Sequence, residues 1–421
     1  MSDGEAAPRS PEPGSESRGR TRERRRKART VLVAHPSAEL YGSDRVLLES
    51  VSGLLAAGWQ VVATVPRPGP LVDELVARGA GVEICPTPVL RKSALRPAGL
   101  VRFALEVAAS VAPACRLLAR TGAEAVYVNT VTVPTWMLWG RVLRRRVLCH
   151  VHEAEGSASP LLRRLLALPL LLAHQVLVNS TFSLDVLGSA IPTLRRRATV
   201  IYNGVPGPSA PTPARAVLTP PIRLLFVGRL SPRKGPQVAV AAAAELQRRG
   251  VEVHLHLLGA VFSGYEWFEA QLRQAVAAAG LVDAVRFLGF DADVWPHLGA
   301  SDIVVVPSVL DEPFGNTAVE AMLAARPLVV SATSGLREAA QGYPSAVFVT
   351  PDQPEALAEA VLDVVANWPV YREQALADSA RARARHSVER YRSEVAAVVN
   401  RAAKSPSLSL GRRRLSRPRS R

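Results

Sequence analysis

Two glutamates separated by seven intervening residues flank a glycine in the segment EPFGNTAVEAM (312–322), shortly after the run DIVVVPS (302–308). The apolar run predicts a buried strand. Gly315 occupies the strand-to-helix turn, where an unusual backbone or a close ligand approach is needed. The next residues open a helix, so the amides of Asn316 and Thr317 have no partner within it. Together with the positive end of the helix dipole, these amides form a phosphate site.

The two glutamates can serve different parts of a ligand bound at this helix start. Glu320 lies one turn after Asn316 on the same face, within reach of a vicinal diol such as a ribose. Glu312 precedes the turn on the cleft side, where a sugar would lie. The alternative is that both glutamates are solvated surface charges and Gly315 only makes a turn, because short motifs also occur by chance.

A second anion-binding element precedes this segment by about ninety residues in the sequence. The run IRLLFVG (222–228) predicts a strand that ends at Gly228 and continues as GRLSPRKG (228–235). Arg229 can offer two parallel hydrogen bonds to a diphosphate, and Lys234 adds a compact positive charge. The alternative is a basic surface loop without a ligand.

The combination of GRLSPRKG, SDIVVVPS, EPFGNTAVEAM and SGLRE resembles the large E-x7-E family of GT-B glycosyltransferases (glycosyltransferase family four, group 1), over about residues 30–403. The resemblance implies two doubly wound Rossmann-like α/β domains that face a central cleft. It implies that Arg229 and Lys234 bind the donor diphosphate, that Glu320 binds the ribose, and that Glu312 contacts the donor sugar. It also implies retention of anomeric configuration. The implied donor-binding set is Gly42, Ser43, Gly228, Arg229, Lys234, Glu312, Phe314, Gly315, Asn316, Thr317 and Glu320.

The first half of the chain contributes a turn and a histidine pair. After the first predicted strand, the family usually has a glycine-rich turn near the donor phosphates, and here Tyr41-Gly42 retains one glycine. Gly42 and the Ser43 amide can do this work, although Ser43 could equally cap the next helix. The strand VLCHV places His150 and His152 on one face, and both are expected to meet the cleft. The resemblance makes His152, followed by Glu153, a catalytic candidate; the alternative is a hydrogen-bonded core pair.

The sequence disfavours metal binding at two places where it could be suspected. The histidine pair has no third ligand at suitable spacing for zinc. Asp291-Ala-Asp293 resembles the metal-binding DxD of another glycosyltransferase class, but Asp293 is expected to cap a short helix. The expectation is therefore a metal-independent enzyme without a cofactor, in which the nucleotide-diphospho-sugar is a co-substrate and cations stabilise the leaving diphosphate.

Strand and helix patterns alternate along the chain, as expected for parallel βαβ units, and a predicted strand over ATVIYNG (198–204) closes the first half. Residues 205–221 contain six prolines and predict a semi-stiff linker. The predicted organisation is a basic tail at 1–29, an N-terminal acceptor-binding domain at 30–204, the linker, a C-terminal nucleotide-sugar-binding domain at 222–386, a helix at 387–403 that crosses back, and a second basic tail at 404–421. Ligands of such open sheets bind at the carboxyl ends of the strands.

Charge is concentrated at the ends of the 421-residue chain. The segments 1–30 and 404–421 carry +4 and +7, so +11 of the net +16 lies there, and both are expected to be disordered. Three widely spaced cysteines fit reduced thiols in a cytosolic protein. The start MSDGEAAPRS is no signal peptide, and the apolar run 165–173, interrupted by Pro169, is too short to span a bilayer.

These features predict a retaining hexosyltransferase that uses a UDP- or GDP-sugar and acts on a glycan or lipid-linked acceptor in cell-envelope polysaccharide or glycolipid synthesis. The segment PLLRRLLALPLLLAH (160–174) and nearby arginines suggest contact with an anionic membrane at its cytoplasmic face. An ordinary buried helix with a solvated basic face is equally compatible. The alternative function is a non-catalytic basic protein that binds membrane or nucleic acid on this scaffold; no nucleic-acid partner is expected, because the body lacks aromatic stacking arrays.

Overall fold

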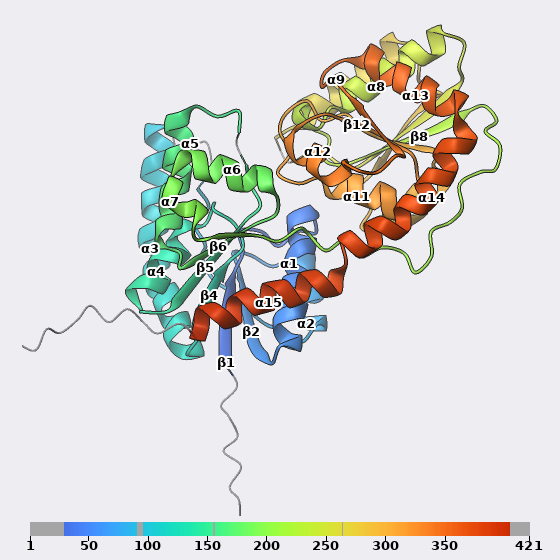
Figure 1. Cartoon of the computed structure of the whole chain (residues 1–421). Coiled ribbons are helices and arrows are strands. Elements are labelled where there is room, and N and C mark those ends of the chain that lie inside the picture. The colour runs from blue at the N-terminus through green and yellow to red at the C-terminus, as the bar shows by residue number, and fades with distance from the viewer. Residues whose placement is uncertain (1–28, 91–95, 155, 263, 405–421) are drawn as a thin grey trace, which may run out of the picture.

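The computed structural model describes residues 29–90, 96–154, 156–262 and 264–404. Most of both predicted basic tails, residues 1–28 and 405–421, lies outside them. The described chain forms two α/β domains joined by residues 205–221, which contain no helix or strand (Figure 1).

The N-terminal domain is built on a seven-stranded parallel sheet in the order β3-β2-β1-β4-β5-β6-β7. Its strands are β1 (Arg29–Ala34), β2 (Trp59–Val65), β3 (Gly81–Ile84), β4 (Ala125–Val128), β5 (Arg146–Val151), β6 (Gln175–Val178) and β7 (Ala198–Val200). The strand expected over 198–204 is shorter than predicted and ends at Val200, after which the chain leaves the sheet.

The C-terminal domain repeats this architecture with a six-stranded parallel sheet in the order β10-β9-β8-β11-β12-β13. Its strands are β8 (Ile222–Val227), β9 (Val253–Leu258), β10 (Val285–Gly289), β11 (Ile303–Val306), β12 (Leu328–Ser331) and β13 (Ala346–Val349). Strand order reverses between β1 and β4 in the first sheet and between β8 and β11 in the second. Both domains are therefore doubly wound, and the predicted GT-B fold class is confirmed.

Helices cover both faces of each sheet. Those of the N-terminal domain are α1 (Gly42–Ala56), α2 (Pro70–Ala77), α3 (Pro97–Thr121), α4 (Pro134–Val142), α5 (Pro160–Ala167), the 3-10 helix η2 (Leu168–Leu172), α6 (Thr181–Ala190) and α7 (Pro192–Arg195). Those of the C-terminal domain are the 3-10 helix η3 (Pro232–Lys234), α8 (Pro236–Arg248), α9 (Glu266–Ala278), α10 (Trp295–Ala300), α11 (Asn316–Leu323), α12 (Ser334–Ala340), α13 (Pro354–Ala366) and α14 (Trp368–Arg385).

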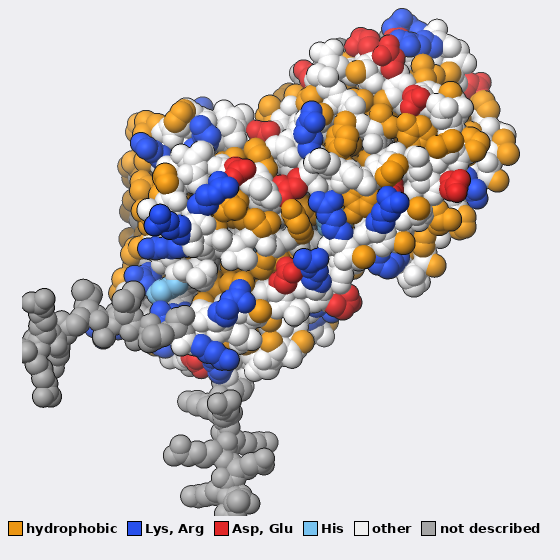
Figure 2. All heavy atoms as spheres, viewed as in Figure 1, with side chains coloured by type: hydrophobic (Ala, Val, Ile, Leu, Met, Phe, Trp, Pro, Cys, Tyr) orange, Lys and Arg blue, Asp and Glu red, His pale blue; other side chains and the backbone are white. Residues whose placement is uncertain are grey.

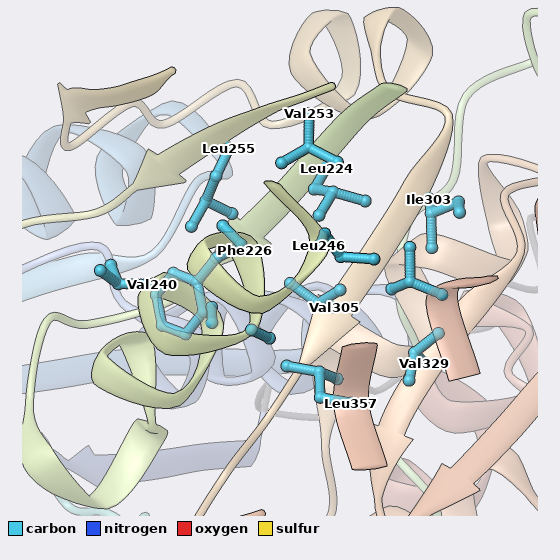
Figure 3. Packing of buried hydrophobic residues seen from close by; sticks show 14 of the residues in the cluster. Leu224, Phe226, Val240, Leu246, Val253, Leu255, Ile303, Val305, Val329 and Leu357 are labelled. Atoms are coloured by element: carbon cyan, nitrogen blue, oxygen red, sulfur yellow. The ribbon is translucent and has the colours of Figure 1, made fainter. Parts of the chain in front are cut away.

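The hydrophobic core of the C-terminal domain explains why the sequences of its central strands are apolar throughout. Leu224 and Phe226 of β8 and Val305 of β11 pack under Leu246 of α8 and Leu357 of α13 (Figure 3). The opposite face of the same sheet packs on α11 and α12, so both faces of each central strand are buried. A fully buried leucine or valine contributes roughly 1.5–3 kcal/mol, so these layers hold the strand ends in place.

The last helix, α15 (Val388–Lys404), returns to the N-terminal domain and packs beside α1 (Figure 1). Tyr391 lies 2.6 Å from the Ser50 hydroxyl, and Asn400 accepts a hydrogen bond from the Trp59 indole at 3.0 Å. A Cβ added to Gly53 would lie 2.6 Å from the carbonyl oxygen of Arg392, so only glycine permits this approach of the two helices. The end of the chain therefore ties the two domains together.

Candidate functional site

One pocket of about 390 Å³ lies between the two domains, at the carboxyl edges of both sheets. Its walls come from the segments after β1, β5, β8 and β11, next to the points where strand order reverses. All the predicted site residues line it: Gly42, Ser43, His152, Gly228, Arg229, Lys234, Glu312, Phe314, Gly315, Asn316, Thr317 and Glu320. Tertiary folding thus brings together residues up to 278 positions apart in the sequence, Gly42 and Glu320.

The start of α11 has the predicted geometry for an anion. Gly315 precedes the helix with a φ of 114°, and an added Cβ would lie 2.5 Å from the Leu336 side chain. The first amide bonded within the turn is that of Ala318, which donates to the Gly315 carbonyl at 3.1 Å. The amides of Asn316 and Thr317 therefore precede the hydrogen-bonded turn and border the pocket.

Lys234 and Glu312 form an ion pair in the wall of the pocket. The Lys234 ammonium lies 2.9 Å from the Glu312 carboxylate, and the Arg233 guanidinium lies 3.6 Å from it. Burial acts to raise the pKa of Glu312, but Lys234 and Arg233 outweigh it and the net pKa is lowered. Glu312 is therefore ionised at neutral pH and holds Lys234 at the pocket wall, where a phosphate could compete for it.

Arg229 lies within an aromatic cluster that joins the domains. Its guanidinium carbon is 3.2 Å from the ring centre of Phe262 and 4.8 Å from that of Tyr41. Burial lowers the pKa of Arg229 to about 10, so the side chain remains charged at neutral pH. Its Nε has no hydrogen-bond partner, which leaves a buried donor that a ligand oxygen could satisfy.

Glu320 faces the N-terminal domain across the cleft. Its carboxylate lies 3.9 Å from the Arg45 guanidinium of α1. Burial raises the pKa of Glu320, and Arg45 and Lys234 offset only part of that rise. A buried carboxylate with one distant cation can accept further hydrogen bonds, and the two hydroxyls of a diol could donate them.

A chain of hydrogen bonds runs through the N-terminal side of the site. His152 Nε2 lies 3.1 Å from Asn129 Oδ1, Asn129 Nδ2 lies 3.1 Å from His35 Nδ1, and His35 Nε2 lies 2.6 Å from Asp44 Oδ1. In this amide orientation Asn129 accepts from His152 and donates to His35, so His35 donates to Asp44. Burial, with smaller contributions from His150 and His35, lowers the pKa of His152 well below its usual value. His152 is therefore neutral and has a fixed tautomer.

Three expectations for single residues are wrong. His150 does not reach the pocket: it lies within β5 and is fully buried beside Tyr127, 2.6 Å from its hydroxyl, whereas His152 follows the end of the strand and lines the pocket. Ser43 does not cap α1, since the helix already begins at Gly42 and the Asp44 carboxylate accepts from the Tyr41 amide. Asp293 is not the cap of α10, although its carboxylate accepts from the Trp295 amide at 3.2 Å.

Sequence reasoning missed three polar residues of the site. Asn129 directly follows β4, and Asn203 donates a 2.8 Å hydrogen bond to Asn316 across the cleft. Arg45 belongs to the exposed first turn of α1 and contacts Glu320. Only the rule that ligands bind at the carboxyl ends of central strands could have drawn attention to Asn129.

Glu338 fastens the two domains beside the site. Its carboxylate accepts hydrogen bonds from the Thr181 and Phe182 amides at the start of α6, at 2.7 and 3.1 Å, and from the Tyr202 hydroxyl at 2.7 Å. The Ser180 hydroxyl also donates to the Pro313 carbonyl at 2.5 Å. An acid at a helix start is favourable, so this contact stabilises the arrangement in which the pocket is assembled.

Asp291, of the DxD motif, also lines the pocket, and its carboxylate lies 2.9 Å from His297 Nε2. Within the described ranges, no group of three or more His, Cys, Asp and Glu side chains is arranged to hold a metal ion.

Comparison with known proteins assigns both domains. Residues 41–206 match the family model Glycosyltransferase Family 4, and residues 214–384 match Glycosyl transferases group 1. Glycogen synthase of Mycobacterium tuberculosis is 36% identical over 169 residues, which is 40% of this chain and 39% of that protein. D-inositol 3-phosphate glycosyltransferase of Mycolicibacterium gilvum is 32% identical over 208 residues, 47% of this chain and 46% of the relative. The matches thus span less than half the length of these curated relatives.

Solved structures show the same fold over nearly the whole chain. HepE of Anabaena in complex with UDP-glucose superposes with a TM-score of 0.73 at 22% identity, covering 88% of this chain and 99% of HepE. A glycosyltransferase from Rickettsia africae also has a TM-score of 0.73, at 18% identity, covering 90% and 99% of the two chains. This protein is therefore a two-domain chain of the GT-B fold, whose halves match Glycosyltransferase Family 4 and Glycosyl transferases group 1 in that order.

Proposed function

We propose that this protein is a glycosyltransferase that transfers a hexosyl group from a UDP- or GDP-sugar, with retention of configuration, to a glycan or lipid-linked acceptor. The observation that carries the proposal is the convergence of Arg229, Lys234 and the α11 amides on one pocket that also holds two buried glutamates. This convergence supports a site in which groups suited to a phosphate lie beside groups suited to a diol. HepE, which shares the fold, has been solved with UDP-glucose bound.

The catalytic task of this pocket is to stabilise charge on the departing diphosphate. Arg229 and Lys234 supply positive charge, and the amides of Asn316 and Thr317 add hydrogen-bond donors. The pyrophosphate is proposed to draw Lys234 away from Glu312, which leaves the Glu312 carboxylate free to accept from a sugar hydroxyl. This cationic set supports a reaction that needs no metal, and it predicts that a chelator leaves the rate unchanged.

Retention is proposed to proceed by attack on the face from which the diphosphate leaves, with a diphosphate oxygen taking the acceptor proton. The carboxylates at the sugar end support this, because each retains partners in the donor complex: Glu312 accepts from the Ser308 hydroxyl and, as proposed, from a sugar hydroxyl, and Glu153 accepts from the Thr130 hydroxyl and the His152 amide. Neutral His152 would then orient a hydroxyl through hydrogen bonding rather than by its charge.

The first experiment is a thermal-shift screen of nucleoside diphosphates with the full chain. A ligand at a hundredfold excess over its Kd stabilises a protein by about 2.7 kcal/mol, which is readily measured. We expect UDP or GDP to raise the melting temperature, and Lys234→Ala to abolish the rise. The matching sugar nucleotide should then be turned over, and proton NMR should show a product with the donor's anomeric configuration. Absence of stabilisation by any nucleoside diphosphate would refute the proposal, whereas an inverted product would refute retention alone.

The cellular role is proposed to be cell-envelope polysaccharide or glycolipid synthesis on the cytoplasmic side of the membrane. Basic residues of the N-terminal domain support membrane contact: Arg163 and Arg164 belong to α5, and Arg141 lies in the last turn of α4. Figure 2 shows Lys and Arg side chains distributed over the visible surface of this domain.

A further inference from the structure

Helix α3 presents two opposite faces that both lack cover from the rest of the protein. One face carries Gly99, Arg102, Phe103 and Glu106, whose spacing of three and four residues places them on one side of the helix. These residues line a second cavity of about 970 Å³, which shares Tyr41, Ser43 and Arg229 with the proposed donor pocket. This cavity, which we name the acceptor chamber, therefore adjoins the proposed donor pocket.

The outward face of α3 is apolar and exposed. Val101 and Leu105 are 60% and 67% exposed, and Leu100 beside them is 58% exposed. By length and composition α3 is apolar enough to cross a membrane, and among the described helices it alone meets that criterion. Its most apolar 18-residue window is only 11% buried within the protein.

The other end of α3 is anchored in the core of the domain, which argues against a helix that crosses a membrane. Ala114, Leu117 and Leu118 pack into the core under β1 and β4 and are almost completely buried. Pulling them out would break the domain, at roughly 2–5 kcal/mol for each large side chain lost from the core. The exposed first half of the helix is therefore a stripe fixed to the domain surface.

Neighbouring elements extend this stripe. Helix α3 contacts α4, α4 contacts η2, and η2 contacts α5. The apolar face, as we call it, comprises the exposed residues Leu100, Val101, Leu105, Leu138, Val142, Leu161, Leu165, Leu168 and Leu171. These elements lie on one side of the N-terminal domain in Figure 1, and hydrophobic spheres gather along that edge in Figure 2. Contiguous apolar surface of this kind marks an interaction site.

The charge around the apolar face identifies its partner. The sequences of α3, α4, α5 and η2 contain six arginines and one acid, Glu106, which is paired with Arg102 at 3.0 Å; Arg120 is paired with Glu83 at 2.8 Å, so four arginines remain in excess of acids. A second copy of the chain would bring like charges together, which is unfavourable. Anionic lipid headgroups complement the arginines, and the acyl boundary accommodates the leucines and valines.

We propose that the apolar face rests on an anionic lipid bilayer, with Val101 and Leu105 at the boundary between headgroups and acyl chains. The opposite face of the same helix then holds the acceptor chamber beside the membrane, where the polar head of a membrane-anchored acceptor can enter. The identity of the chamber rests on the proposed glycosyltransferase function, whereas membrane docking does not.

The test is co-sedimentation of the full chain with vesicles of phosphatidylcholine, with and without phosphatidylglycerol. The variant is Val101→Gln with Leu105→Gln. The matched control is Val370→Gln with Leu376→Gln, which are 54% and 57% exposed on α14 in the other domain. Because all these side chains are exposed, both variants should fold. We expect the wild type and the control to bind the anionic vesicles, and the α3 variant to bind roughly tenfold more weakly or worse.

Each other outcome overturns the proposal. Wild-type chain that stays in the supernatant has no lipid affinity, and equal binding of the α3 variant would assign binding to other segments, such as the basic tails. Equal binding to vesicles without phosphatidylglycerol would remove the role of the arginines. If light scattering shows a wild-type dimer that the α3 variant dissociates, the apolar face is an interface between copies. Stabilisation by UDP or GDP, measured on the same preparations, reports on the proposed function independently.

Discussion

Replacing Arg229 by methionine tests the proposed diphosphate cradle without disturbing the fold. The guanidinium lies 3.2 Å from the Phe262 ring centre and 4.8 Å from that of Tyr41, and the two contacts stabilise the folded state by about 0.5–2 kcal/mol each. Against this stands a buried Nε without a partner, which costs about 1–3 kcal/mol. Methionine fills much of the same space between the rings, so we expect the free energy of unfolding to change by no more than about 1 kcal/mol.

Catalysis should respond very differently. Loss of one group that stabilises transition-state charge in a shielded site lowers kcat by roughly 10²–10³, or about 2.7–4 kcal/mol. The assay is release of nucleoside diphosphate from the sugar nucleotide at saturating donor, with the melting temperature recorded in parallel.

Arg273→Met is the matched control, because Arg273 also lies over an aromatic ring, 4.1 Å from the centre of Phe287, but far from the pocket. It should retain wild-type kcat. The reasoning would be refuted if Arg229→Met kept its rate within about threefold, since a diphosphate-binding cation must cost more.

Three further substitutions address the ribose contact, a buried ion network and domain closure. Glu320→Gln should weaken nucleotide binding about 10- to 100-fold, the value of a hydrogen bond to a charged acceptor, and titration calorimetry that finds an unchanged Kd would exclude the ribose role. Asp302→Ala leaves Arg215 and Arg223 without their buried partner and should cost about 3 kcal/mol in urea unfolding at neutral pH. Burial acts to raise the pKa of Asp302, but the two arginines outweigh it and lower the net value. Its stabilisation is therefore complete above the unfolded pKa of about 3.9 and is lost as the pH falls, so the cost of the variant should shrink in acid, and a cost that does not depend on pH would contradict this assignment. Glu338→Gln removes the charge held by the α6 amides and should raise the radius of gyration in X-ray scattering; an unchanged value would mean that other contacts hold the domains closed.

The alternation of apolar runs and helical patterns was sufficient to predict two doubly wound domains. Strands such as IVVV in β11 are buried on both faces. This burial requires an entirely apolar sequence, which can be recognised without the structure. The predicted end of the strand at 204 was wrong. The residues beyond Val200 have a strand-like composition, but they leave the edge of the sheet.

The proposed donor side of the site could be predicted from sequence, because the residues that form it lie close together in the chain. Gly315, the amides after it and Glu320 belong to one turn and one helix, so their spacing alone places them together. On the acceptor side the relevant neighbours come from different strands. The contact of Asn129 with His152 and His35 joins β4 to the ends of β5 and β1, and no sequence spacing predicts it.

By itself, the sequence determined the two doubly wound domains and the glycine turn before α11, since these follow from local periodicity and a short motif, and the family resemblance added a set of residues that line the interdomain pocket. Only the tertiary structure decided which charges are neutralised and which surfaces stay uncovered. Lys234 is held by Glu312, Arg229 lies between aromatic rings from both domains, and Leu100 and Leu105 of α3 are exposed whereas Leu117 and Leu118 are buried. Pairing and burial depend on what the rest of the chain packs against each side chain, and that depends on contacts between residues far apart in the sequence.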